Sequence, residues 1–153
     1  MIKEGDKAPA FKAKDQNGNT IQLSGLKGKK VILYFYPEDD TPTCTEEACN
    51  MRDNFSLLKK KGFIILGVSP QDEKSHKKFA DKFHLPFSLL ADPDRKITMA
   101  YGCWGWKKLF GHEYMGVLRT TFVIDEKGKI EKIFSKVVSK RHAAQILESY
   151  TNE

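Results

Sequence analysis

The amino-acid sequence predicts an α/β fold in which helices flank a central mixed β-sheet. Residues 31–36 and 63–68 are apolar on both faces of an extended chain, which is typical of central strands that are covered on both sides. Apolar residues at helical spacing follow these strands, and the alternation of strand and helix favours the α/β class.

Two hairpins complete the predicted strands. Residues 15–19 contain Asn-Gly, which suits the positive-φ positions of a tight turn, and Ile21 and Leu23 alternate after it. Residues 121–124 and 130–134 are predicted to form two further strands, and the sequence DEKGK between them predicts a hairpin connection.

The first predicted helix is defined by one apolar face. Ala48, Met51, Phe55 and Leu58 lie at i, i+3, i+7 and i+10, which places them on the same side of a helix. Gly62 is expected to end this helix.

The other helix starts are predicted from capping residues. Ser69 fits an N-cap before Pro70, with Asp72 in the first turn, and Asp92-Pro93 begins a short helix by the same logic. The buried sides of the three remaining helices are Phe79 and Phe83, then Ile97, Ala100 and Tyr101, and then Ala143, Ile146, Leu147 and Tyr150.

Length and composition describe one soluble globular domain that spans residues 1–153. Hydrophobic residues make up 40% of the chain and charged residues 30%, which excludes disordered and fibrous proteins. The longest apolar runs are far shorter than the roughly 20 residues that cross a bilayer, and the first ten residues contain no apolar signal-peptide core. We therefore expect a cytoplasmic protein without a membrane partner.

The formal net charge of +6 comes mostly from lysine, because 22 of the 26 basic residues are Lys and only four are Arg. These residues are scattered along the chain. A nucleic-acid-binding surface would be better supported by an Arg-rich stripe interleaved with aromatic residues. A basic nucleic-acid-binding module is therefore the least favoured interpretation, and we expect no nucleic-acid partner.

Cys44 lies where the first strong strand passes into the first helix. Thr41 and Pro42 fit an N-cap followed by proline, whereas Thr43 and Glu46 fit a capping box around the cysteine, so two helix starts are open. Either start places Cys44 in the first turn, where unpaired amide hydrogens and the helix dipole favour an anion. The thiolate is the nucleophilic form of cysteine, so the position predicts a reactive thiol, although the glutamates at positions 46 and 47 oppose the charge.

Cys49 follows Cys44 after five positions. On an unbroken α-helix, five residues rotate a side chain by about 140° and advance it by about 7.5 Å. A disulfide requires Cα atoms closer than about 7 Å and Cβ atoms that point together. If these two cysteines form a disulfide, the first turns of the helix must therefore unwind.

Other uses of the cysteines fit less well. The gap between Cys44 and Cys49 is longer than in common zinc knuckles. A plant-type iron–sulfur site would need a cysteine in place of Arg52. A dithiol isomerase would need C-x-x-C spacing, which is absent. Cys103 is expected to be a packing residue, and we expect neither a cofactor nor a metal. The histidines lack ligand spacing and are expected to be ordinary surface or hydrogen-bonded residues: His76, His84, His112 and His142.

The segment PEDDTPTC, residues 37–44, matches the peroxiredoxin signature P-x-x-x-T/S-x-x-C. With Cys49 five residues further on, the chain resembles the bacterioferritin comigratory protein / peroxiredoxin Q subfamily of atypical two-cysteine peroxiredoxins. The resemblance begins at GDKAPAF, residues 5–11, and extends through RTTFVID, residues 119–125. One departure is Thr43, which stands where members of the subfamily usually carry Gly.

This resemblance implies a thioredoxin-like fold and a thiol-dependent peroxidase that reduces hydrogen peroxide and organic hydroperoxides. Cys44 matches the peroxidatic cysteine and Cys49 the resolving cysteine. Thr41 matches the hydroxyl that hydrogen-bonds the thiolate and the peroxide, Pro37 the residue that shields the pocket from water, and Arg119 the arginine that stabilises the thiolate and the transition state.

The implied reaction cycle passes through a Cys44 sulfenic acid and an intramolecular Cys44–Cys49 disulfide, which thioredoxin or a similar dithiol then reduces. Such a disulfide requires only one chain, so we expect a monomer. The alternative is a non-catalytic redox sensor that uses the same disulfide switch. Turnover separates the two, because only a peroxidase consumes many equivalents of peroxide per chain.

Overall fold

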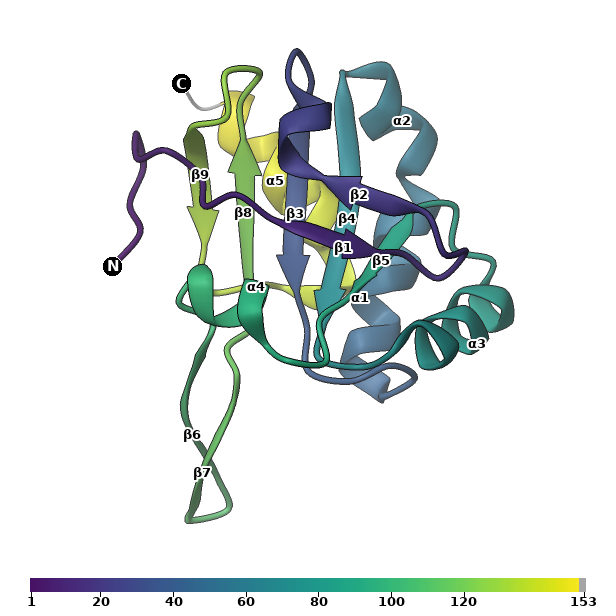
Figure 1. The fold of residues 1–153 in the computed structure, drawn as a ribbon, viewed down its shortest axis with the longest axis vertical. Helices are drawn as coiled ribbons and strands as arrows, with labels where there is room; N and C mark the ends of the chain where they lie inside the picture. The colour runs from purple at the N-terminus through teal and green to yellow at the C-terminus, as the bar shows by residue number, and fades with distance from the viewer. Residues whose placement is uncertain (152–153) are drawn as a thin grey trace.

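The computed structural model describes residues 1–151 and builds them around a five-stranded mixed sheet with helices on both faces (Figure 1). The order of the strands is β5-β4-β3-β8-β9; β3, β4 and β5 are parallel, whereas β8 and β9 pair antiparallel. The predicted α/β class with a mixed sheet is confirmed. The strands are β3 (Lys30–Phe35), β4 (Phe63–Ser69), β5 (Ser88–Ala91), β8 (Thr120–Ile124) and β9 (Ile130–Phe134).

Strand β3 lies at the centre of the sheet and contributes to both hydrophobic cores. Ile32 and Tyr34 point to one face, and Val31, Leu33 and Phe35 point to the other, because successive side chains of a strand alternate. The first face is covered by α1 (Pro42–Asp53), α2 (Phe55–Lys60), α3 (Glu73–Phe83) and α5 (His142–Thr151). The second face is covered by the N-terminal segment, the hairpin of β1 (Lys12–Lys14) and β2 (Thr20–Gln22), and α4 (Lys96–Ala100).

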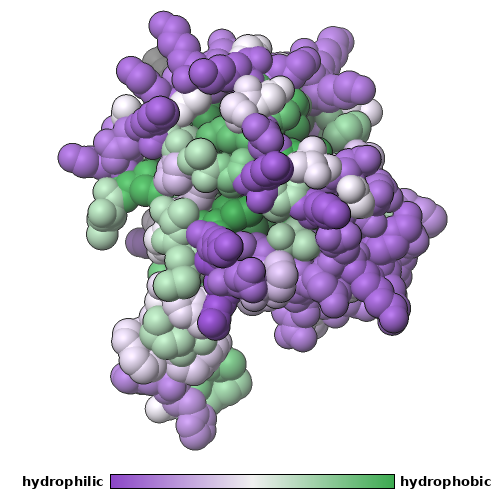
Figure 2. All heavy atoms as spheres, in the orientation of Figure 1, coloured by the Kyte–Doolittle hydropathy of each residue, from purple (hydrophilic) through white to green (hydrophobic). Residues whose placement is uncertain are grey.

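A third hairpin projects from the body of the molecule (Figure 1). It consists of β6 (Trp104–Leu109) and β7 (His112–Val117), joined by Phe110 and Gly111, which both have positive φ angles. Local sequence patterns did not predict this hairpin, since its turn lacks the Asn-Gly pair that marks the first one. Figure 2 shows that its surface mixes polar and apolar residues.

The start of α3 differs from the prediction. Ser69 does not cap this helix, because β4 continues through it to pair with Ala91 of β5. Asp72 is the N-cap instead, and its carboxylate accepts the backbone N–H of Ser75 at 2.8 Å. The helix therefore begins at Glu73.

Two other helix predictions need correction. α4 begins at Lys96 and not at Pro93, and its N-cap is Arg95 and not Asp92. The Asp92 carboxylate still accepts the backbone N–H of Thr98 in the first turn, at 2.8 Å. The first predicted helix is broken at Asn54 into α1 and α2, and the Asn54 side chain donates to the Asn50 carbonyl at 2.8 Å. Within residues 1–151, no helix is both long and apolar enough to span a membrane.

Candidate active site

Cys44 lies in the first turn of α1, shortly after β3 ends. The helix begins at Pro42 with Thr41 as the N-cap, so the first of the two predicted starts is right, and the capping box at Thr43 is wrong. Thr43 is exposed on the outside of this turn. The Cys44 side chain is only 2% exposed and belongs to the hydrophobic core beneath α1.

Arg119 contacts Cys44 directly, although the two residues are 75 positions apart. Phe35, the last residue of β3, pairs with Thr120 at the start of β8, so the antiparallel register brings Arg119 to the end of β3. Its Nη2 donates to the Cys44 sulfur at 3.1 Å. Because the guanidinium is positively charged at any working pH, it places a fixed cation against the sulfur.

Glu47 holds the other side of the same guanidinium. Nη1 of Arg119 donates to Glu47 Oε1 at 2.7 Å, and the Glu47 side chain is fully buried. Burial raises the pKa of Glu47 to about 7, and this effect outweighs the charge and hydrogen bond of Arg119, which act in the opposite direction. The carboxyl group therefore binds a proton more readily than an ordinary glutamate does at neutral pH.

From the sequence, Glu47 was expected only to oppose the charge of a thiolate. Its burial follows from helical spacing, since Cys44, Glu47, Ala48 and Met51 lie at i, i+3, i+4 and i+7 and are all buried. That spacing alone could have identified Glu47 as a buried residue of the helix. Within the described residues, two buried oxygens have no hydrogen-bond partner, Glu47 Oε2 and Tyr34 Oη.

His142, the first residue of α5, is buried beside Glu47. Its Nε2 lies 3.8 Å from Glu47 Oε2 and 2.7 Å from Thr121 Oγ1, while Nδ1 lies 2.9 Å from Gln145 Oε1. These partners assign Nδ1 as the donor and Nε2 as an acceptor. Burial, and then the positive charge of Arg119, lower the pKa of His142, so the ring is neutral at neutral pH. His142 is thus a hydrogen-bonded residue as predicted, but it does not lie on the surface.

Thr41 and Pro37 lie in the segment between β3 and Cys44. The Thr41 hydroxyl donates to the Glu38 carbonyl at 3.0 Å, so its single proton is not directed at the sulfur in this structure. Pro37 follows β3, and its carbonyl accepts the Ser69 hydroxyl at 3.2 Å. Both residues therefore belong to a loop that is fixed by hydrogen bonds.

Asp39 anchors this loop to α3. Its carboxylate accepts the Tyr36 hydroxyl at 2.6 Å, the Ser75 hydroxyl at 2.7 Å and Nδ1 of His76 at 2.7 Å. The other ring nitrogen of His76 faces the Leu90 carbonyl at 3.0 Å. His76 is therefore a buried positioning residue, which the spacing of the histidines did not reveal.

The three cysteines are free thiols. Cys49 is partly exposed and lies in the same unbroken helix as Cys44, so this structure is the state in which the pair cannot bond. Cys103 is buried, and burial raises the pKa of its thiol to about 12. It remains protonated at neutral pH, in agreement with a packing role.

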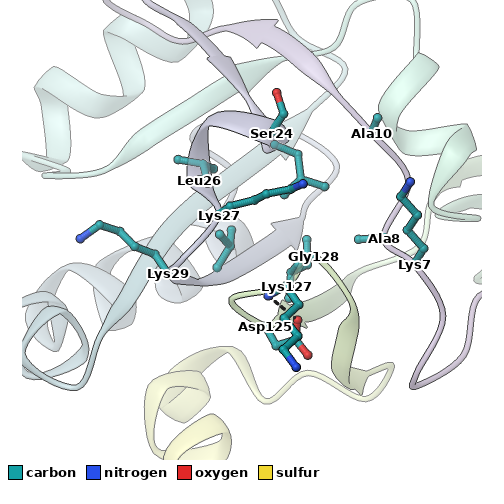
Figure 3. Close-up of a pocket in the computed structure, with 13 residues that line it drawn as sticks. Lys7, Ala8, Ala10, Ser24, Leu26, Lys27, Lys29, Asp125, Lys127 and Gly128 are labelled. Atoms are coloured by element: carbon teal, nitrogen blue, oxygen red, sulfur yellow. Dashed lines mark hydrogen bonds between the residues drawn. The ribbon is translucent and has the colours of Figure 1, made fainter.

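A separate cavity of about 210 Å³ lies at the opposite end of β3 (Figure 3). Its floor is apolar and includes Leu26 and Ile124, and its rim includes Lys7, Lys27 and Lys127. The lining contains no cysteine or histidine. The reactive centre is therefore the buried Cys44 and its arginine, not this hollow.

A mixed sheet with a cysteine at a helix start, facing a fixed arginine, defines a thiol-based redox protein. Comparison with known proteins makes the class specific. The AhpC/TSA family matches residues 4–133. Peroxiredoxin Bcp of Bacillus subtilis is 45% identical over 148 residues, covering 97% of this chain and 94% of that protein. Peroxiredoxin Bcp of Escherichia coli is 40% identical over 146 residues, covering 95% of this chain and 94% of that protein.

Solved structures agree with this assignment. Peroxiredoxin Q of Xanthomonas campestris superimposes with a TM-score of 0.89 at 29% identity, over 97% of this chain and 98% of that one. Peroxidoxin BcpB of Mycobacterium tuberculosis superimposes with a TM-score of 0.86 at 32% identity, over 99% of this chain and 98% of that one. The chain belongs to the AhpC/TSA family, among the peroxiredoxins of the Bcp and peroxiredoxin Q type. The expected thioredoxin-like fold is confirmed.

Proposed function

We propose that this protein is a thiol-dependent peroxidase that reduces hydrogen peroxide and organic hydroperoxides. The observation that carries the proposal is the Cys44 sulfur in the first turn of α1, 3.1 Å from a guanidinium N–H of Arg119. The bacterioferritin comigratory protein of Xanthomonas campestris, which is 28% identical, has been studied for its alkyl peroxide reduction activity. This relationship supports the substrate class.

In the first step, the Cys44 thiolate attacks one peroxide oxygen. The S–O bond forms as the O–O bond breaks, and the second oxygen leaves as hydroxide or alkoxide and takes up a proton. Negative charge spreads over both oxygens in the transition state, where Arg119 and the amides of the first turn are donors. The Thr41 hydroxyl donates its hydrogen bond to the Glu38 carbonyl, so its oxygen is available to accept the O–H of the hydroperoxide. Pro37 shields the pocket from water.

Glu47 adjusts the charge of the site. A fully ionised partner would neutralise much of the positive charge of Arg119. Because the pKa of Glu47 is raised to about 7, the carboxyl group holds the guanidinium in place while cancelling only part of that charge. We assign Glu47 as a positioning residue for Arg119.

In the second step, the sulfenic acid on Cys44 condenses with the Cys49 thiol, forming a disulfide and releasing water. The unbroken helix between the two cysteines must unwind for this bond to form. Thioredoxin or a similar dithiol then restores both thiols by exchange. The cycle needs one chain, which supports a monomer, and a reducing cytoplasm suits a transient disulfide.

Peptide mapping after one equivalent of hydrogen peroxide tests the two-cysteine cycle. We expect a Cys44–Cys49 peptide pair in the wild type and an identical pair in the control Cys103→Ala. A disulfide that includes Cys103, or a stable sulfenic acid at Cys44, would contradict the role of Cys49. Turnover with thioredoxin then separates a peroxidase from a redox sensor, since a sensor stops after one equivalent.

A further inference from the structure

A histidine of α3 holds the loop that precedes the reactive cysteine. The side chain of Asp39, in the middle of that loop, is 4% exposed, and the side chain of His76 beside it is fully buried. Nδ1 of His76 lies 2.7 Å from Oδ2 of Asp39. A buried carboxylate is costly unless it is paired, so this contact fixes Asp39, and with it the loop, against α3.

The partners of His76 define where its protons lie. The Leu90 carbonyl, 3.0 Å from Nε2, can only accept a hydrogen bond, so Nε2 carries a proton. The Asp39 carboxylate already accepts the Tyr36 hydroxyl at 2.6 Å and the Ser75 hydroxyl at 2.7 Å. A further proton must lie between Nδ1 and Oδ2 to close their contact. The ring therefore joins two elements, because one nitrogen binds β5 and the other binds the loop.

The loop has a backbone shape that needs such support. Asp40 has a φ angle of 60°, in the left-handed region that residues other than glycine seldom adopt. A conformation of this kind persists where the surrounding structure fixes it. The Gln71 side chain accepts the backbone N–H of Asp39, and Nζ of Lys82 lies 2.7 Å from Oδ2 of Asp40. Both partners belong to α3 or to the segment just before it, so α3 is the support of the loop.

Two groups of the candidate active site depend on this loop. The Thr41 hydroxyl donates to the Glu38 carbonyl at 3.0 Å, and that hydrogen bond closes over Asp39 and Asp40, the two residues that α3 holds. The direction of the Thr41 oxygen therefore follows the position of the loop. Pro37 precedes Glu38 in the same loop, so the residue that shields the pocket moves together with the oxygen that accepts the peroxide O–H.

We infer that His76 is a positioning residue for the first step of the proposed reaction, and that it acts through Asp39 on Thr41 and Pro37. The inference rests on the proposed peroxidase function and adds to it a residue that reaches the reacting groups through the loop. The contact of His76 with Asp39 carries this role, whereas the contact with Leu90 stabilises the fold. Loss of the first contact lets the loop relax from its left-handed turn and displaces the Thr41 oxygen.

Two substitutions of His76 separate the two contacts. The side-chain nitrogen of asparagine takes the place of Nδ1 and that of glutamine the place of Nε2, so His76→Asn keeps a donor for Asp39 and His76→Gln keeps a donor for Leu90. In a Cys49→Ser background, the sulfenic acid on Cys44 accumulates. Rapid quenching, trapping with dimedone and mass spectrometry then measure how fast hydrogen peroxide forms it.

The two variants should differ in rate but not in stability. A displacement of about 1 Å at a reacting group can cost about 10²-fold in rate, so His76→Gln should slow formation of the sulfenic acid about 10- to 10²-fold. His76→Asn should keep the rate of its Cys49→Ser parent. Thermal unfolding should show both variants to be less stable than the parent, because each loses one buried hydrogen bond. A residue with a structural role alone would affect the two rates alike.

Lys82→Met is the matched control, since the exposed pair of Lys82 with Asp40 joins the same helix to the same loop but contributes little energy. It should leave the rate unchanged. Ser75→Ala removes one donor to Asp39 and should slow the step by a smaller factor than His76→Gln does. If His76→Gln does not fold, Ser75→Ala carries the test alone.

Equal rates in the two His76 variants would overturn the assignment, and so would a Ser75→Ala variant as fast as its parent. Absence of sulfenic acid in the Cys49→Ser parent would instead contradict the proposed peroxidase function.

Discussion

Glu47 and Arg119 form an ion pair beneath α1, with Nη1 of Arg119 2.7 Å from Oε1 of Glu47. Burial raises the pKa of the Glu47 carboxyl group in this pair. The pair places the second nitrogen of the guanidinium against the Cys44 sulfur. A carboxyl group that titrates near neutrality beside the reacting sulfur links the stability of the fold and the charge of the site to pH.

The pH dependence of stability should reveal this group. Between the usual pKa of 4.5 and about 7, folded Glu47 holds a proton that the unfolded chain has lost, so the free energy of unfolding falls as pH rises through this window. A shift of this size corresponds to about 3 kcal/mol. Urea denaturation from pH 4 to pH 8 should therefore show the wild type losing about that much stability relative to Glu47→Gln.

Glu148→Gln provides the control, because Glu148 is exposed and pairs with Arg141 on the surface. Its stability relative to the wild type should change little over the same range. A difference between wild type and Glu47→Gln that is constant from pH 4 to pH 8 would show that folding does not shift the pKa of Glu47.

Loss of the guanidinium should reduce catalysis more than stability. Arg119→Met removes a donor that is aimed at the developing negative charge, and a single such donor contributes roughly 10²- to 10³-fold to the rate. We expect kcat/KM for hydrogen peroxide to fall by about this factor. Arg119→Lys should be intermediate, because an ammonium retains the charge but not the two fixed donors.

Arg141→Met serves as the control for the loss of one arginine, since Arg141 lies on the surface and contacts only Glu148 among the acidic residues described. It should keep wild-type kcat/KM. An Arg119→Met variant that is folded by circular dichroism and fully active would rule out the assigned role of Arg119.

Sequence patterns predicted the strands of the sheet well because burial on both faces leaves a strong signal. All four strands predicted for the main sheet are present, including the edge strand β9, with bounds that shift by one residue or less. The four-residue strand β5 and the projecting β6–β7 hairpin were not predicted. The first is too short to show alternation, and the second mixes Lys, Trp and Gly because it does not cover the core.

The candidate site was predicted only in part, because its cluster depends on tertiary register. Local spacing placed Cys44 at a helix start. The contact with Arg119 arises from the pairing of β3 with β8, which no local pattern encodes, and it was expected only by resemblance. His142 approaches Glu47 from the last helix, so no pattern around either residue could reveal their contact.

The buried thiol of Cys103 should be unreactive in the folded protein. Burial raises its pKa to about 12, so at pH 8 only about one molecule in ten thousand carries the reactive thiolate. Brief treatment with iodoacetamide at pH 8, followed by mass spectrometry, should modify Cys44 and Cys49 and leave Cys103 unmodified until urea is added. Rapid modification of Cys103 without urea would show that its environment opens readily.

Unwinding of α1 on oxidation should stop at Asn50. The Asn50 side chain ties the second half of the helix to the C-terminal region, with Nδ2 donating to the Lys140 carbonyl at 3.0 Å and Oδ1 accepting the Ala143 N–H at 2.8 Å. The first half depends on the contacts of Cys44 and Glu47 with Arg119, and oxidation of the sulfur removes one of them. Because each helical amide donates to the carbonyl four residues earlier, hydrogen exchange after one equivalent of peroxide should show lost protection for the amides of residues 45–53, whose acceptors lie in residues 41–49. The amides of Asn54 and Leu58 should stay protected, because they donate to the carbonyls of Asn50 and Asn54.

Two variants separate this mechanism from general loosening of the helix. Cys49→Ser cannot form the disulfide, so the amides of residues 45–53 should stay protected after the same treatment. Asn50→Ala loses two side-chain hydrogen bonds, which together contribute about 1–3 kcal/mol, and the exposed segment of its oxidised form should extend beyond residue 53. Full protection of the amides of residues 45–53 in a wild-type protein that carries the Cys44–Cys49 disulfide would mean that the bond forms without unwinding, which the geometry of a continuous helix does not permit.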